Sequence, residues 1–157
     1  MRKKIINTTQ QETSSLNQEY LNLEEIVTVE LISEDSDYPI ESALRSKKNG
    51  QWRAATPGKQ TIRLLFDHPQ QLKRVNLSFQ ESHIERTQEY VIRYLSRNEN
   101  SFKEIVRQQW NFSPEGNTIE KEEHHVDLHD VTELELIIIP DINGGETRAS
   151  LMQLQLA

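Results

Sequence analysis

The fold is decided by residues 49–66, which read Asn49-Gly50-Gln51-Trp52-Arg53-Ala54-Ala55-Thr56-Pro57-Gly58-Lys59-Gln60-Thr61-Ile62-Arg63-Leu64-Leu65-Phe66. Two turn signals, Asn49-Gly50 and Pro57-Gly58, enclose a tryptophan. An alternating run follows, and its residues Ile62, Leu64 and Phe66 fall on one face because side chains alternate along a strand. The stretch therefore predicts a loop that carries Trp52, followed by a strand with one buried face.

The same alternation recurs on both sides of this stretch. Apolar and polar residues alternate in residues 25–31, 74–79, 102–112, 126–129, 133–138 and 153–156, and residues 90–95 are β-branched and aromatic. Turn signals such as Asp67-His68-Pro69 separate the runs, and the only helical candidate is the short segment 39–45. About eight strands at this spacing predict an all-β fold, an eight-stranded antiparallel β-sandwich of the jelly-roll type.

The first residues differ from the rest of the chain. Residues 1–22 are rich in Gln, Asn, Thr, Ser and Glu and hold few apolar side chains. Such a composition cannot bury enough apolar surface to offset the entropy of folding. We therefore expect residues 1–22 to be a disordered or loosely attached tail and residues 23–157 to form the sandwich domain.

Composition supports a single folded domain. The chain has 157 residues, of which 34% are hydrophobic, and it has no cysteine. The absence of cysteine excludes disulfide frameworks and thiolate metal or redox sites. No apolar run approaches the roughly 18 residues of a membrane helix, and the basic start at Arg2 turns polar at Asn7 without the apolar region of a signal peptide. We therefore expect a cytoplasmic protein that does not bind membranes.

Charge is unevenly distributed. The net charge is -7, yet residues 45–107 are net basic and the segments on both sides are acidic. One interpretation is that folding interleaves these segments, so that the charges neutralise one another across strands. The other is a basic surface for an anionic partner. The negative total argues against nucleic-acid binding, which depends on neutralising phosphates.

The residues around the tryptophan resemble a known family. Residues 49–62, followed by the run from Asp67 to Val75, resemble the galactose-binding-like β-sandwich superfamily, which includes discoidin and coagulation-factor type C domains. The Trp52-Arg53-Ala54-Ala55 stretch is also similar to the N-terminal domain of the single-strand-break repair scaffold protein. The resemblance covers roughly residues 24–157. It implies a sandwich whose loops at one end bind ligands, which are carbohydrates in many members.

Two departures from the family pattern bear on the ligand. Sugar-binding members often place an arginine just after the strand equivalent to residues 75–79, where this chain has Gln80 and Glu81. The Asp-Gly pair that usually precedes the tryptophan loop is Asn49-Gly50 here. Both departures weaken the implication of galactose binding in particular and suit a relative with another ligand.

Topology predicts where a ligand would bind. Strand direction reverses at each turn, so the tryptophan loop and the loop between Phe79 and Tyr90 should gather at one end, opposite the turn at Pro69. Trp52 is expected to close that end of the sandwich as a structural residue. Arginine and histidine supply hydrogen-bond donors there, and asparagine and glutamate supply further polar partners. The predicted ligand-binding residues are Arg45, Asn49, Arg53, His83, Glu85 and Arg86.

Two clusters suggest metal binding. Glu34, Asp35 and Asp37 follow the first strand, where the superfamily often holds a structural calcium, and hard carboxylate oxygens suit that ion; a solvated acidic loop is the alternative. His125 and His129 share a strand face but lie roughly 13 Å apart. A solvated polar face therefore explains them better than one metal site. No cofactor other than this calcium is expected.

Function is narrowed to binding. The sequence has no nucleophile elbow, no phosphate-binding glycine loop and no His-Glu-x-x-His motif, so we expect no enzyme activity. The first hypothesis is a non-catalytic ligand-binding module, with a glycan partner held by loops at one end of the sandwich. The alternative is an intracellular protein–protein interaction or scaffold domain, with a protein partner on a flat, apolar patch.

Overall fold

The computed structural model describes residues 20–45 and 50–157. These residues form eight strands and two short helices, and the helix predicted within residues 39–45 is confirmed. Neither helix is long and apolar enough to cross a membrane. The elements are α2 (Leu23–Ile26), β1 (Val27–Leu31), α3 (Glu41–Leu44), β2 (Trp52–Arg53), β3 (Gln60–Gln80), β4 (Arg86–Ser96), β5 (Lys103–Phe112), β6 (Ile119–Ile139), β7 (Ser150–Leu151) and β8 (Gln153–Leu156).

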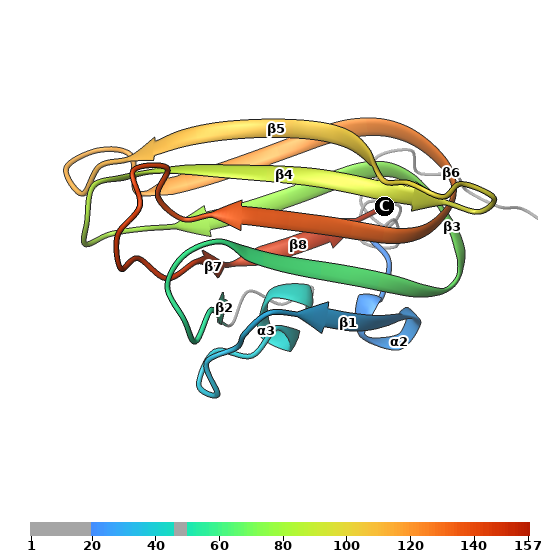
Figure 1. Ribbon diagram of the computed structural model, residues 1–157, viewed down its shortest axis with the longest axis horizontal. Helices are drawn as coiled ribbons and strands as arrows, with labels where there is room; N and C mark the ends of the chain where they lie inside the picture. Colours follow the sequence, from blue (N-terminus) through green and yellow to red (C-terminus); the bar gives the residue numbers. More distant parts are fainter. Residues whose placement is uncertain (1–19, 46–49) are drawn as a thin grey trace, which may run out of the picture.

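Two long strands, β3 and β6, shape the molecule. They pair antiparallel along their whole length, from Gln60 opposite Ile138 to Gln80 opposite Ile119. Figure 1 shows both strands doubling back at the same end of the molecule. The predicted turn at Pro69 is therefore corrected to a bend inside a continuous strand. The pairing register is interrupted there, and such an irregularity tolerates a proline that has no N–H to donate.

The bend divides the strands into two facing layers. In the first layer the order is β1, the first half of β3, the second half of β6, β4 and β5. In the second layer β8 pairs with the second half of β3, which pairs with the first half of β6. The rings of Phe79 and Tyr90 meet between the layers, 5.4 Å from centroid to centroid. The antiparallel jelly-roll sandwich predicted from the alternating pattern is confirmed.

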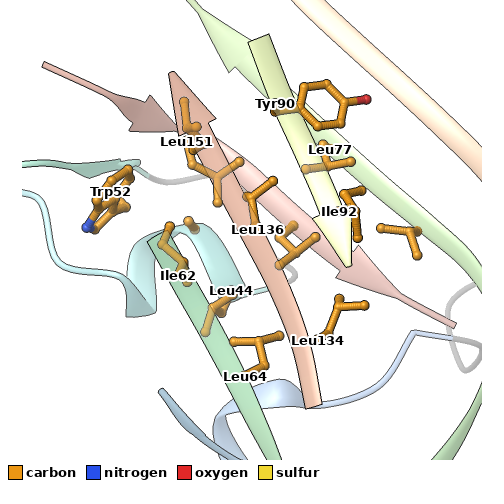
Figure 2. Close-up of a cluster of buried hydrophobic side chains, with 14 of the residues drawn as sticks. Leu44, Trp52, Ile62, Leu64, Leu77, Tyr90, Ile92, Leu134, Leu136 and Leu151 are labelled. Carbon is orange, nitrogen blue, oxygen red and sulfur yellow. The ribbon is translucent and has the colours of Figure 1, made fainter. Parts of the chain in front are cut away.

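The core lies between these layers, as the alternation predicts. Ile62 and Leu64 of β3 lie beside Leu136 and Leu134 of β6 on the inner face of the first layer, and all four side chains are buried. Figure 2 shows that α3 adds Leu44 to this cluster. Each side chain of this size contributes roughly 1.5–3 kcal/mol when it is fully buried. The cluster continues to Leu77 and Leu154 of the second layer, so its burial holds the two layers together.

The basic middle segment is neutralised across strands. Arg63 on β3 pairs with Glu30 on β1 at 3.4 Å and with Glu135 on β6 at 2.7 Å. Lys73 pairs with Asp127 at 2.6 Å. These contacts join residues of the basic segment to the acidic segments on either side. They support the first of the two interpretations of the charge pattern.

The described end of the predicted tail contacts the sandwich. Tyr20 accepts a hydrogen bond from Asn76 Nδ2 at 2.9 Å, and the Arg74 guanidinium lies 5.2 Å from the centre of its ring. The Leu21 N–H donates to the Leu156 carbonyl at 2.7 Å. The division into a tail of residues 1–22 and a domain of residues 23–157 stays a prediction. The remainder of that tail, residues 1–19, lies outside the described residues.

Candidate functional site

Several loops gather at the end of the sandwich opposite the bend (Figure 1), and they enclose a hollow of about 310 Å³ that we call the loop-end hollow. This volume is at the lower end of the range for small-molecule sites, about 300–1,000 Å³. The lining residues are Tyr38, Gln51, Arg53, Gln80, Glu81, Ser82, His83, Arg148 and Ser150. An adjoining hollow shares Arg53, Glu81, His83 and Arg148 and adds Ile84, Glu146 and Thr147.

One wall of the loop-end hollow comes from the tryptophan loop. Trp52 is fully buried, and its Nε1 donates to the Ser33 carbonyl at 3.2 Å. Because side chains alternate, Arg53 on the same short strand points to solvent. The Arg53 N–H donates to the Tyr38 carbonyl at 3.1 Å, and the Asp35 N–H donates to the Arg53 carbonyl at 2.8 Å. Because Trp52 is buried, Arg53 is exposed. The backbone hydrogen bonds of Arg53 hold the Tyr38 loop beside it.

The opposite wall is the loop of residues 81–85. The Glu81 carboxylate accepts hydrogen bonds from Arg86 Nε at 2.8 Å and from the His83 N–H at 3.1 Å. Burial opposes ionisation, but these hydrogen bonds hold the pKa of Glu81 below its usual value. Glu81 is therefore an ionised acceptor that also shapes its own loop.

The third wall carries Arg148. Its backbone is held by the Gly58 N–H, which donates to the Thr147 carbonyl at 3.1 Å, and by the Ala54 N–H, which donates to the Ala149 carbonyl at 2.9 Å. The Arg148 side chain is 42% exposed, and its Nη1 lies 3.8 Å from Asp35 Oδ2, a loose ion pair. Its hydrogen-bonding capacity is therefore largely unused.

The structure brings together two of the predicted ligand-binding residues. Arg53 and His83 line the same hollow, as the loop topology predicts. Glu85 is exposed on the His83 loop but does not line either hollow. Arg45 pairs with Glu24 at 2.6 Å beside the α2 helix, away from the loop-end hollow. Asn49 lies outside the described residues.

Arg86 requires a correction. Sequence analysis placed it in a binding loop, but it begins β4 and is only 3% exposed. Its Nη1 donates to the Pro140 carbonyl at 2.7 Å and to Gln88 at 3.1 Å, and its guanidinium lies 4.7 Å from the centre of the Phe112 ring. Its polar partners allow it to be buried. Arg86 is an internal support for the Glu81 loop and is removed from the ligand-binding set.

The predicted calcium ligands are not gathered into a site. Glu34 accepts a hydrogen bond from the Ile40 N–H at 2.6 Å, and Asp35 accepts one from the Asp37 N–H at 3.0 Å. Within residues 20–45 and 50–157, no group of three or more His, Asp or Glu side chains is placed to hold a metal ion. The carboxylates of Glu34 and Asp35 accept hydrogen bonds within their own loop, and a calcium ion at Glu34, Asp35 and Asp37 stays a prediction. The exposed His125 and His129 belong to a solvated face, as expected.

Tyr38, Glu81 and Arg148 were missed by sequence reasoning. Arg148 meets Arg53 only because β2 and β7 pair over two residues, opposing Arg53 to Ser150. A two-residue strand leaves no alternating pattern to detect. Glu81 could have been found, because it immediately follows Gln80 at the end of a strongly alternating run.

No family model matches the chain, and no curated protein matches its sequence. Among solved structures it is similar to the family 32 carbohydrate-binding module of NanJ from Clostridium perfringens, solved with galactose. The two are 15% identical over 87% of this chain and 96% of that chain, with a TM-score of 0.62.

Two further structures show the same likeness. One is the family 32 module CpGH89CBM32-5 from Clostridium perfringens, in complex with GalNAc-β-1,3-galactose, at 16% identity over 87% of this chain and 98% of that chain, with a TM-score of 0.60. The other is the F5/8 type C domain of a Bacteroides fragilis protein, at 14% identity over 87% and 93%, with a TM-score of 0.60. At identities this low, the structural likeness establishes the fold alone. It confirms the predicted resemblance to galactose-binding-like sandwiches, whereas the resemblance to the repair scaffold stays a prediction.

Proposed function

We propose that this protein is a non-catalytic carbohydrate-binding module that holds its ligand in the loop-end hollow. The observation that carries the proposal is a pair of arginines with unused donors on one hollow. Arg53 makes no side-chain hydrogen bond or ion pair with the described residues, and Arg148 has only its loose pair with Asp35. A guanidinium presents up to five N–H groups in a rigid fork. That geometry suits neighbouring hydroxyl oxygens of a sugar ring.

Sugar hydroxyls also need acceptors and an apolar surface. Glu81 supplies an ionised carboxylate on the opposite wall, and charge-assisted hydrogen bonds are stronger than neutral ones. Tyr38, a residue that is 37% exposed, adds a ring whose apolar face can cover the C–H face of a sugar. The complexes of similarly folded modules with galactose and GalNAc-β-1,3-galactose support the choice of ligand class.

The proposal that the module is non-catalytic rests on the pKa values and positions of its carboxyl groups. Glycoside hydrolysis uses one carboxylic acid that keeps its proton and a second carboxylate beside the same bond. Among the described residues, the carboxyl with a strongly raised pKa is Glu120, which is buried between the layers and does not line the hollow. Glu81 is held ionised by Arg86. The hollow therefore has hydrogen-bonding groups suited to binding, without an acid–base pair.

The proposal is tested by glycan-array screening followed by calorimetric titration of galactose and of the glycan that binds best. Changing Arg53 and Arg148 together to Ala should weaken binding at least tenfold, with an unchanged melting temperature. Arg45→Ala is the matched control, because it removes an exposed arginine far from the hollow. A folded double variant with unchanged affinity would place the site elsewhere.

A protein partner is the second candidate, and one observation favours it. The exposed large hydrophobic side chains of the described residues all lie at the loop end: Ile32, Tyr38, Ile84, Ile119 and Ile142. Apolar side chains gathered at one end are typical of interaction surfaces. Ile84→Ser with Ile142→Ser should abolish capture of a protein partner and leave glycan affinity unchanged, which separates the two candidates.

A further inference from the structure

The loop-end hollow continues onto the outer face of the three-stranded layer formed by β8 and halves of β3 and β6. A second hollow lies there, with a volume of about 360 Å³. We call it the outer-face hollow. It shares Tyr38, Gln51 and Gln80 with the loop-end hollow. Because three residues line both, the two hollows adjoin each other.

Strand alternation decides which side chains line the outer-face hollow. Leu77 and Phe79 of β3 are buried, so Ser78 between them points outward. On β6, Glu120 is buried, so Ile119 and Lys121 point outward. Ile119 is 45% exposed. Its position at the hollow gives it an apolar surface that a ligand can cover.

The two hollows differ in chemistry. The loop-end hollow holds the guanidiniums of Arg53 and Arg148, whereas the outer-face hollow combines the apolar Ile119 and Met152 with polar neighbours Ser78, Gln51 and Gln80. Among the residues that the structure describes, its one charged lining residue is the exposed Lys121. An apolar floor with uncharged donors and acceptors at its edges matches a neutral sugar, which has a C–H face and a rim of hydroxyls.

We infer that the ligand is an oligosaccharide whose terminal unit occupies the loop-end hollow and whose following, uncharged units occupy the outer-face hollow. The ring of Tyr38 lies where one unit passes to the next. This inference rests on the proposed function and adds the length and charge class of the ligand. A ligand that fills both hollows gains contacts that a monosaccharide lacks. Its loss of rotational and translational freedom grows little in return.

The experiment compares glycans of different length. The oligosaccharide that binds best on the array is titrated calorimetrically beside its shorter fragments, down to its terminal monosaccharide. The expected result is an affinity that rises roughly tenfold or more from the monosaccharide to the trisaccharide. Equal affinities would overturn the inference and leave the proposed function standing.

Variants locate the added affinity. Ser78→Tyr fills the outer-face hollow with a residue that strands favour, and it should bring the trisaccharide to the affinity of the monosaccharide while leaving monosaccharide binding unchanged. Gln155→Tyr is the matched control on the outward face of β8. It does not line the hollow and should change neither affinity. A folded Ser78→Tyr protein that keeps full trisaccharide affinity would contradict the inference.

The charge class has its own test. Lys121→Gln should leave trisaccharide affinity within twofold, because uncharged units do not need the ammonium group. If a sulfated or carboxylated oligosaccharide binds the wild-type protein and loses most of its affinity for the Lys121→Gln variant, the inference that the following units are uncharged would be overturned. If no glycan binds at all, the proposed function falls together with this inference. That result differs from the equal affinities that would overturn the inference alone.

Discussion

Two glutamates on strand β6 are buried to the same degree, yet their pKa values are shifted in opposite directions. Glu120 is 0% exposed and Glu135 is 1% exposed. Glu135 accepts hydrogen bonds from Arg63 and Arg93 on the two flanking strands. Both guanidiniums lie against the ring of Phe102, at 5.5 and 4.9 Å from its centre. Burial raises the pKa of Glu135, but the two arginines outweigh it and hold that pKa below its usual value.

Among the described residues Glu120 forms no ion pair, and the charge of Arg86 favours its ionised form only slightly. Its Oε1 accepts a hydrogen bond from Gln88 at 3.3 Å, and its Oε2 has no donor among the described residues. Burial, reinforced by the charge of Glu122, raises the pKa of Glu120 to about 8. The difference teaches that burial sets the cost of a charge, whereas the partners placed around it decide whether that cost is offset.

The largest expected effect follows from removing the compensated acid. Glu135→Gln leaves two arginines without their shared carboxylate and should lower the free energy of unfolding at pH 7 by about 2–4 kcal/mol. Because the pKa of Glu135 is lowered in the folded state, its stabilisation is present above the ordinary value of 4.5 and is lost as the pH falls. Urea unfolding at pH 7 and at acid pH measures both. A loss no larger than that of Glu133→Gln would show that the arginines do not depend on Glu135.

The second effect has the opposite sign. The pKa of Glu120 is raised in the folded state, so its contribution is most favourable below about pH 4.5 and is lost as the pH rises through about 8. Glu120→Gln should therefore stabilise the protein at pH 9 by about 1–3 kcal/mol and flatten its stability between pH 5 and 9. Urea unfolding across that range is the measurement. A variant with the wild-type pH slope would show that Glu120 titrates normally.

Sequence patterns predict the strands around these acids but not the acids' different roles. Alternation assigns Ile62 and Leu136 to the core because one side of each strand is apolar. The same rule places Glu135 on the face opposite Leu134 and Leu136, but it does not reveal that Arg63, Arg93 and Phe102 cover that face. Residue 120 lies outside the alternating runs, and its contact with Gln88 depends on pairing between distant segments, which one sequence does not reveal.

The candidate site also combines residues that the sequence predicts with residues that it does not. Loop order along the chain suffices to bring Arg53 and His83 to one end of the sandwich. Arg86 was misassigned because an arginine next to a turn signals solvent, whereas this one finds its partners in Glu81 and a backbone carbonyl. Arg148 reaches the hollow through a two-residue strand pair that has no sequence signature.

A third, smaller effect tests the aromatic cover of the compensated acid. Phe102→Leu keeps an apolar side chain but removes the ring under both guanidiniums. Each such cation–π contact is worth about 0.5–1 kcal/mol at exposed sites, so a loss of about 1–2 kcal/mol is expected. The loss of stability in acid should occur at the same pH as in the wild-type protein, because the arginine–glutamate hydrogen bonds remain. Chemical unfolding at pH 7 and in acid separates these two results, and a shift in that pH would mean that the ring positions the arginines.

The smallest effect lies beside Glu120. The Tyr90 hydroxyl is 2.6 Å from His124 Nε2, and burial lowers the pKa of this histidine. Tyr90→Phe should cost about 1 kcal/mol, the net value of one hydrogen bond, and should move the His124 titration followed by NMR. Tyr94→Phe on the same strand is the control. An unmoved His124 titration would show that the tyrosine does not influence its ring.

The pairing of β3 with β6 also bears on how the chain is made. Gln60 must find Ile138 and Gln80 must find Ile119, so these contacts join residues far apart in sequence. Folding rates fall as such separations grow, and we expect refolding on the millisecond-to-second scale. On the ribosome β3 is complete long before β6 emerges, and at roughly 5–20 residues per second the wait is several seconds. During that wait β3, an alternating strand of 21 residues, lacks β6 along one edge and β8 beside its second half, and these edges are exposed to chaperones and to aggregation.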